Sequence, residues 1–289
     1  MTNIRIKNFD IGDIYPTRIM AAINLSTESF YKKSVVSPVE ENEIRERIFS
    51  VVEQKAEFID LGPQSSAPAS LYNQETKISP SEEINRIKKP LEIIKELNLK
   101  QIISIDTQSA LVADYALSNG ADVINDISGL KFDSNLAKTI ANYSAFVICM
   151  ACDKNPGDIF KTDEVINSLS QSKNIAINAG INDKKILIDP GIGGWTPQRT
   201  PQDDYKLILD TQKIKNNLHL PSLLALSRKS FIGKILNLKP EERLYGSLSA
   251  TAISILYGAN IIRTHDIKET KEAVLIAEEF KKLLVNSSK

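Results

Sequence analysis

The sequence has little of several residue types, and each shortage argues against a class of protein. Its 289 residues include only two cysteines and two histidines, too few for a disulfide-rich scaffold or a zinc site built from several such ligands. The 36 basic residues balance the 36 acidic residues. A nucleic-acid-binding protein usually carries a basic excess, so this balance argues against that function. With 12 Gly and 12 Pro, the composition has no collagen-like or disordered bias.

Long apolar runs of the kind found in targeting and membrane segments are also missing. Residues 1–18 mix charged with isolated apolar residues, so no secretory signal is expected. The stretch from Leu244 to Ile262 is uncharged over roughly a membrane-spanning length, but it is interrupted by Ser, Thr, Gly and Tyr. We predict a buried helix, a turn and a buried strand there. No membrane partner is expected, and the expected location is the cytoplasm.

The two cysteines, Cys149 and Cys152, form a C-x-x-C pair. A redox pair would lie at a helix start, where the thiolate is stabilised. A zinc site would need two further ligands, and His219 and His265 are distant in sequence. We interpret the pair as structural and keep a redox or metal role as the alternative.

Eight short apolar runs, separated by helical patterns, indicate the strands of a parallel sheet. Continuous apolar runs are typical of strands that are covered on both faces. Eight strands alternating with helices match an α/β fold, the (β/α)8 TIM barrel, which typically takes about 250 residues. We predict one such domain over residues 1–289, with a doubly wound open sheet as the alternative. The runs are Ile19–Ile23, Phe58–Leu61, Ile102–Ile105, Val123–Ile124, Ala145–Cys149, Ile186–Ile188, Leu223–Leu226 and Asn260–Arg263.

Three helix starts carry a capping signal. The segments 37–40 and 79–82 each place Ser, then Pro, and Glu three residues after the Ser. This pattern predicts a capping box with Ser37 and Ser79 as N-caps. Residues 200–203, Thr-Pro-Gln-Asp, are a weaker version. The last helix is predicted to carry Ala273, Ala277, Phe280 and Leu284 on one apolar face.

Polar side chains follow most of the predicted strands. In this barrel the active site lies at the carboxyl ends of the strands, so these side chains are expected to converge on one rim. Carboxylates and amides suit the edge of a flat, nitrogen-rich ring, whereas cations suit an anion and can stack on a ring. One wall is therefore predicted to bind a heterocycle and the other phosphate or pyrophosphate. The first group is Asp106, Asn125 and Asp189, and the second, read as donors and cations, is Lys229, Arg263 and His265.

The same segments resemble the motifs of the dihydropteroate synthase family of pterin-binding barrels. The most specific matches are the segment 227–230, Ser-Arg-Lys-Ser, and the segment 125–129, Asn-Asp-Ile-Ser-Gly. The other matches occur in order along the chain, at residues 19–25, 28–30, 59–62, 104–107, 189–193 and 263–266.

This resemblance implies a transferase of folate biosynthesis. Such an enzyme joins 6-hydroxymethyl-7,8-dihydropterin pyrophosphate to an aromatic amine, such as p-aminobenzoate, and releases pyrophosphate. The resemblance also implies a Mg²⁺ cofactor near Asn24 and a homodimer. Catalysis is assigned to Asp106, Lys229 and Arg263. The residues expected to bind substrate are Asn24, Ser66, Asp106, Asn125, Asp189, Lys229, Arg263 and His265.

The loops depart from the family pattern. Ser66 keeps the hydroxyl of the family's Thr, but Ala67 replaces an Arg, and residues 32–34, Lys-Lys-Ser, replace Asp-Gly-Gly. The family's Lys after the sixth strand is Thr196, and we expect Arg199 to lie close enough to substitute for it. Two explanations remain open. The enzyme uses a different amine, such as a ribosylated aminobenzene, or the chain is a catalytically impaired pterin-binding paralogue that acts as a binding or partner subunit.

Overall fold

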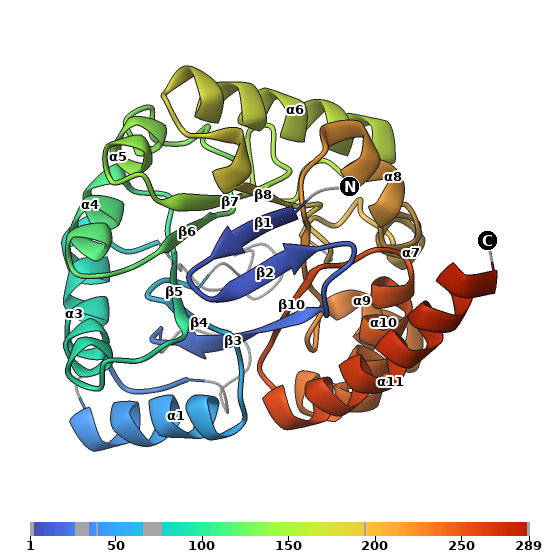
Figure 1. Ribbon diagram of the computed structural model, residues 1–289, viewed down its shortest axis with the longest axis horizontal. Helices are drawn as coiled ribbons and strands as arrows, with labels where there is room; N and C mark the ends of the chain where they lie inside the picture. Colours follow the sequence, from blue (N-terminus) through green and yellow to red (C-terminus); the bar gives the residue numbers. More distant parts are fainter. Residues whose placement is uncertain (1–2, 27–34, 39, 66–76, 194, 288–289) are drawn as a thin grey trace.

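Eight parallel strands form a nearly closed ring with the helices arranged around it (Figure 1). The computed structural model describes residues 3–26, 35–38, 40–65, 77–193 and 195–287. Neighbouring strands follow the order β8-β7-β6-β5-β4-β3-β10-β9. An isolated bridge between Ile188 and Ser222 joins the two ends of this order. The predicted (β/α)8 barrel is confirmed, and the open doubly wound sheet is not found.

The barrel strands lie close to the predicted runs. They are β3 (Arg18–Asn24), β4 (Phe58–Gly62), β5 (Ile102–Asp106), β6 (Val123–Asp126), β7 (Phe146–Met150), β8 (Ile186–Asp189), β9 (Leu223–Ala225) and β10 (Ile261–Thr264). The described α-helices are α1 (Glu41–Glu53), α3 (Pro80–Glu96), α4 (Ala110–Ser118), α5 (Leu136–Asn142), α6 (Thr162–Asn178), α7 (Pro201–Leu209), α8 (Thr211–Leu218), α9 (Ser230–Leu236), α10 (Leu244–Leu256) and α11 (Ile267–Ser287). Short 3-10 turns at η2 (Asp183–Lys185) and η3 (Pro240–Glu242) complete the connections.

An antiparallel hairpin that the sequence pattern does not predict closes one end of the barrel. Its strands are β1 (Asn3–Ile6) and β2 (Phe9–Gly12), which lie across the ring (Figure 1). Ile4, Ile6 and Ile11 are buried in one cluster with the first interior side chains of the barrel strands, such as Phe58 and Ile102. The hairpin therefore fills the amino-terminal end, and the carboxyl ends of the strands are left for a site.

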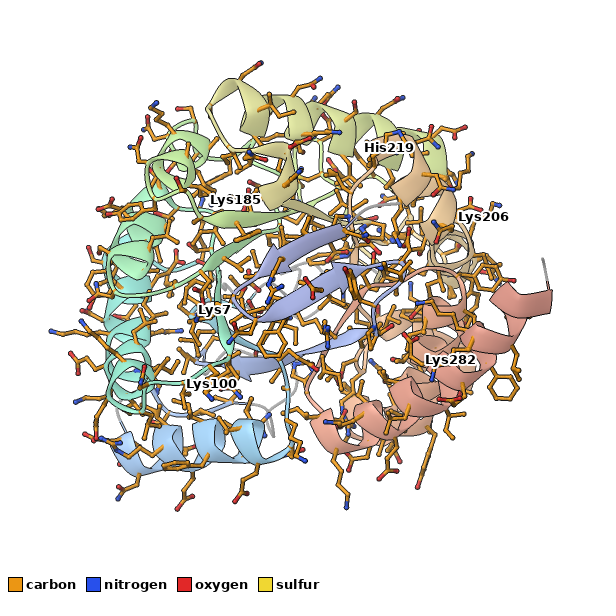
Figure 2. All side chains as sticks on the ribbon, viewed as in Figure 1. Lys7, Lys100, Lys185, Lys206, His219 and Lys282 are labelled. Carbon is orange, nitrogen blue, oxygen red and sulfur yellow. The ribbon has the colours of Figure 1, made fainter. Side chains whose placement is uncertain are left out.

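Polar contacts hold the hairpin in place. Lys7, which belongs to the turn of the hairpin, lies over the barrel strands (Figure 2). The Lys7 ammonium donates to the carbonyl of Gln101 at 2.8 Å and pairs with the Asp122 carboxylate at 2.7 Å. The Arg18 guanidinium donates twice to the Asp10 carbonyl, at 3.0 and 2.8 Å. With strands this short and charges between the apolar residues, the period-2 signal is too weak to identify the hairpin from sequence.

Truncating a hairpin side chain should destabilise the barrel. We expect Ile11→Ala to lower the free energy of unfolding by about 2–5 kcal/mol, because it leaves a cavity in a fully buried cluster. Ile14→Ala is the matched control, because Ile14 is 61% exposed. Urea unfolding of both variants measures the difference, and equal midpoints would show that the hairpin is not part of the core.

Two of the three predicted helix caps are confirmed. Ser79 is the N-cap of α3, and its hydroxyl accepts the backbone N–H of Glu82 at 3.2 Å. Thr200 begins α7 with a complete capping box. Its hydroxyl accepts the N–H of Asp203 at 3.3 Å, and the Asp203 carboxylate accepts the Thr200 N–H at 2.9 Å. The motif that looked weaker in sequence is thus the one with both reciprocal bonds.

The predicted cap at Ser37 is wrong. The helix begins at Glu41 instead. The chain before it is held beside β3, since the Val36 N–H donates to the Asn24 carbonyl at 2.8 Å and Val35 forms a parallel bridge with Asn24. This strand-like pairing keeps residues 35–36 extended and delays the helix.

The apolar face predicted for the last helix is only partly buried. Val274 and Ala277 pack into the core, but Phe280 and Leu284 are 60% and 56% exposed. The uncharged stretch before it folds as α10 and β10, as predicted. Within the described part of the chain, no helix combines the length and apolarity needed to cross a membrane.

Candidate active site

The barrel interior changes from apolar to polar towards the carboxyl ends of the strands. Alternate residues of a strand face the same side. Phe58 belongs to the interior cluster under the hairpin, so Asp60, two residues later on β4, also faces the interior. On β5, Ile102 belongs to the same cluster, so Ser104 and Asp106 face the interior as well. This alternation brings most of the predicted site residues together. The polar layer contains Asn24, Asp60, Ser104, Asp106, Asn125, Asp189 and Arg263.

Arg263 lies at the centre of this layer. Its Nε donates to Asp60 at 2.6 Å, and its Nη2 donates to Asp106 at 3.2 Å. Asp60 is fully buried, and its other oxygen accepts the Ser104 hydroxyl at 2.6 Å. Burial alone would lower the pKa of Arg263, but the two carboxylates outweigh this effect and raise it. The guanidinium therefore stays charged, and Asp60, which was not predicted as a site residue, fixes its orientation.

Asp106 titrates close to neutral pH. Burial raises the pKa of this carboxyl to about 7, against the opposing charge of Arg263. The neighbouring carboxylates of Asp60, Glu83 and Asp126 add to the increase. A carboxylate with a pKa in this range changes charge under ordinary working conditions, as is common at active sites.

Asn125 and Asp189 extend the wall that begins at Asp106. Asn125 is the register partner of Asp106 on the neighbouring strand. The Asp189 carboxylate accepts the Gly191 N–H at 2.7 Å, and burial raises its pKa against the opposing charges of Lys229 and Arg263. All three side chains of this wall are buried. They present acceptors on one side of the interior, as the sequence predicts for the edge of a heterocycle.

Lys229 lies between β9 and α9, where it is the N-cap residue of the helix. Its ammonium donates to the Ile192 carbonyl and lies 5.1 Å from the centre of the Trp195 ring. Burial lowers the pKa of Lys229 to about 8, while the Asp189 and Asp204 carboxylates oppose that decrease. The lysine thus faces the Asp189 end of the wall.

His265 does not act as a cation in this site. Burial, followed by the nearby charges of Arg263 and other cations, lowers the pKa of His265 to about 3. The Asn24 amide nitrogen lies 3.4 Å from Nε2, and the Ser227 hydroxyl lies 3.0 Å from Nδ1. With the Asn24 amide donating to Nε2, Nδ1 carries the proton. The grouping of His265 with the cations is therefore wrong, since it offers hydrogen bonds without charge.

A second ion pair fixes the two loops that carry Lys229 and His265. The Arg228 guanidinium binds Asp266 through two bonds of 2.8 and 2.7 Å. Its Nη1 also donates to the carbonyls of Pro240 and Glu241, at 3.0 and 2.8 Å. These contacts tie the segment after β9 to the segment after β10, so the Arg of the Ser-Arg-Lys-Ser motif is structural.

Arg199 does not replace the missing loop lysine. Its side chain is buried against the Asp204 carboxylate, at 2.8 Å from Nε. The same Asp204 oxygen accepts the Gly193 N–H at 2.8 Å. Arg199 thus helps to hold the loop after β8, and the expectation that it supplies a cation to the site is wrong because its charge faces Asp204. Ser66, Ala67 and residues 32–34 lie outside the described residues.

A large groove opens from the polar layer. It has a volume of about 1230 Å³ and runs over loops that follow β4 to β8. Asp106 and Glu83 lie on one part of its wall and Trp195 on another, with Ser65 and Lys131 among the other lining residues. Small-molecule sites usually measure about 300–1,000 Å³. The groove therefore has room for a second substrate beside the buried wall.

The cysteines do not form a reactive pair. Both are buried free thiols, Cys149 within β7 and Cys152 two residues after the strand ends. Burial raises the pKa of Cys149 well above its ordinary value and that of Cys152 to about 12. The thiolate needed for redox chemistry or zinc binding is therefore disfavoured, which supports the structural interpretation.

Asn24 offers one neutral side-chain oxygen as a possible Mg²⁺ ligand. Within the described ranges, no group of three or more His, Cys, Asp or Glu side chains could hold a metal ion. Mg²⁺ often keeps several waters and binds one or two protein oxygens together with substrate phosphates. A single Asn24 side-chain oxygen fits that kind of binding and does not fit a site built by protein ligands alone.

The site combines a carboxylate and amide wall, a central Arg and a Lys at the rim of a (β/α)8 barrel. These features are those of an enzyme that binds a small polar ring. The family described as pterin binding enzyme matches residues 20–265, and the chain belongs to this family.

Known relatives agree with this assignment. The dihydropteroate synthase of Clostridium beijerinckii is 33% identical over 275 residues, which cover 94% of this chain and 96% of that protein. The Bacillus subtilis dihydropteroate synthase is 33% identical over 256 residues, 88% of this chain and 85% of that protein. The Coxiella burnetii enzyme in complex with pteroic acid superposes with a TM-score of 0.83 at 29% identity, over 98% of this chain and 100% of that one. The predicted resemblance is confirmed, and the chain is a dihydropteroate synthase-like transferase.

Proposed function

We propose that this transferase joins 6-hydroxymethyl-7,8-dihydropterin pyrophosphate to an aromatic amine and releases pyrophosphate. The observation that carries the proposal is the buried wall of Asp106, Asn125 and Asp189 facing Lys229 and Arg263. The wall offers acceptors for the amino and ring N–H groups of a pterin. The two cations offer charge for the ring face and the leaving group. The relatives described above are all named synthases, and none supports the alternative of an impaired partner subunit.

The chemistry needs no protein nucleophile. The bond between the pterin methylene carbon and the pyrophosphate oxygen breaks, and both electrons leave with pyrophosphate. The resulting cation is stabilised by the Asp106 carboxylate. The amine nitrogen donates its lone pair to form the new C–N bond and then loses a proton to pyrophosphate or water. In this scheme Arg263 stacks on the pterin and, with Asn24 and the neutral His265, holds pyrophosphate, while Ser66 supplies a hydroxyl to it.

Mg²⁺ is proposed as the cofactor, bound through the oxygen of Asn24. When bound, the ion would neutralise charge on the departing pyrophosphate. Asn24 lies at the carboxyl end of β3, and its amide is held by the 3.4 Å contact with His265. The chain's own contribution is therefore to orient one neutral oxygen towards the leaving group.

The acceptor is proposed to be p-aminobenzoate or a ribosylated aminobenzene, both of which fit a groove of about 1230 Å³. The test is calorimetry with the pterin pyrophosphate, followed by a panel of these amines with pyrophosphate release as the readout. We expect pterin binding and turnover with one of the two amines. Binding without turnover by any amine would support the partner-subunit alternative, and no binding would refute the proposal.

The loop that carries Ala67 provides a separate prediction. Loss of one preorganised charge-stabilising donor costs about 10²–10³ in rate in other enzymes. We expect weak activity with p-aminobenzoate in the natural sequence and at least about a tenfold higher kcat in Ala67→Arg. Steady-state rates of pyrophosphate release measure this change. Unchanged rates with p-aminobenzoate would indicate that the loop serves a different amine.

A homodimer is proposed through α10 and α11, which pack against each other at one side of the barrel (Figure 1). Large apolar side chains with helical spacing are exposed on both helices, and exposed apolar patches often mark interfaces. They include Ile253 and Leu256 of α10, Tyr257 at its C-cap, and Leu275, Ile276 and Phe280 of α11. The cytoplasmic location stays a prediction.

Phe280→Glu should weaken this dimer. Because it places a charge within the apolar patch, we expect the dimer dissociation constant to rise at least about tenfold. Size-exclusion chromatography with light scattering measures the mass of each species. Phe49→Glu on α1 is the matched control, because Phe49 is also an exposed aromatic but lies on another helix. Identical masses for both variants would rule out this interface.

A further inference from the structure

Among the described residues near the site, Trp195 has its ring held by neighbouring loops on several sides. The indole N–H donates to the Gly191 carbonyl at 3.0 Å, and the backbone N–H of Trp195 donates to the Gly193 carbonyl at 2.9 Å. Only 9% of the residue is exposed, although it lines the groove. One hydrogen bond from the ring and one from the backbone therefore fix Trp195 within the loop that follows β8.

The loop after β7 leaves space for this ring. Gly157 has a φ of +76°, and a Cβ there would lie only 1.9 Å from Cγ of Trp195. The Asp158 carboxylate fixes the conformation of this loop by accepting the N–H groups of Asp153, Lys154 and Asn155 at 2.9, 2.9 and 3.0 Å. Two separate loops thus meet at the tryptophan, with glycine at the point of contact.

The ring in turn faces Lys229. The ammonium lies 5.1 Å from the ring centre, within the range of a cation–π contact. The same segment contacts the lysine twice more. The Ile192 carbonyl accepts from the ammonium, and a Cβ at Gly193 would lie 2.7 Å from the Lys229 Cδ. Ile192, Gly193 and Trp195 therefore contact the lysine side chain at successive points along its length.

We propose that Trp195 is a positioning residue that holds the Lys229 ammonium in place against the pterin wall. The proposal rests on the pterin transfer described above. It places Trp195 in control of a group that contacts substrate. The other charges that face Lys229 are Asp189 on β8, Asp204 on α7, Arg263 on β10 and the buried Arg199. A substitution at Trp195 leaves all four of these charged residues in the chain.

The first test needs no substrate, because Trp195 is the only tryptophan in the chain. We expect its fluorescence to titrate with the Lys229 ammonium, with a midpoint near pH 8. Lys229→Met should abolish this transition, and Lys234→Met, a lysine on the same helix, should keep it. Emission that does not change between pH 7 and 10, or that is unaffected by Lys229→Met, would overturn the proposal even if pterin transfer is correct.

The second test measures binding of the pterin pyrophosphate by calorimetry. Trp195→Leu removes the ring, so we expect about tenfold weaker binding, whereas Trp195→Phe keeps a ring and should stay within about threefold. Phe146→Leu is the matched control, since it removes a ring 5.3 Å from Lys185 at the other end of the barrel. Equal affinities for wild type and Trp195→Leu would refute the positioning role. Failure of the wild type to bind would instead refute the proposed function.

Discussion

Replacing Asp106 with alanine is expected to abolish turnover while the barrel stays folded, with kcat falling by at least about 10²–10³-fold. Asp106 is the buried carboxylate at the carboxyl end of β5 that opens onto the groove. Its loss removes the negative charge that would stabilise the methylene cation. Folding should survive because Arg263 keeps its 2.6 Å bond to Asp60. Steady-state kinetics and circular dichroism measure the two effects.

The same residue predicts the acidic limb of the pH profile. Burial raises the pKa of Asp106 to about 7, and the active form is the carboxylate. Wild-type kcat/KM should therefore fall as the pH drops below about 7, and any residual activity of Asp106→Asn should lack this limb. Asp114→Ala is the control, because Asp114 is an exposed carboxylate on the next helix. A kcat in Asp106→Ala equal to that of Asp114→Ala would exclude the assigned role.

Lys229→Ala is the second substitution for which we expect loss of turnover in a folded barrel. It removes the ammonium that lies near Asp189 and is held by Ile192 and Trp195. A loss of about 10²–10³ in kcat/KM is expected for a preorganised donor of this kind. Because burial lowers the pKa of Lys229 to about 8 and the ammonium is the active form, wild-type kcat/KM should also fall above about pH 8.

The control for this substitution is Lys234→Ala, which removes an exposed lysine of the same helix. Its kinetics should match those of the wild type. Together with the Asp106 limb, the lysine limb predicts a narrow bell-shaped profile between about pH 7 and 8. Wild-type rates in Lys229→Ala, or a profile with no decline above pH 8, would remove the case for the lysine.

The barrel and most of the polar wall could be predicted because one physical rule generates both. Parallel strands covered on both faces read as continuous apolar runs, and the first polar residue after each run lies at the same end of the ring. This rule correctly brings together Asp106, Asn125, Asp189 and Arg263. It requires no knowledge of how the side chains contact one another.

Side-chain partners across the barrel could not be predicted in the same way. Asp60 lies within an apolar run, and only its strand parity, two residues after Phe58, indicates an interior position. Arg199 is close to the site in sequence, but its charge is used by Asp204. His265 has the residue type of a cation, yet burial and neighbouring positive charges keep it neutral. Each error comes from tertiary burial or pairing, which local sequence does not encode.

The closure of the ring has a consequence for synthesis of the chain on the ribosome. The first barrel strand, β3, has the last, β10, as a hydrogen-bonded neighbour, with Arg18 opposite Ile261. While β10 remains inside the exit tunnel, β3 keeps an open edge and the cluster around the hairpin lacks Ile261. Such exposed edges are prone to aggregation. Completion of the core therefore has to wait until β10 has emerged.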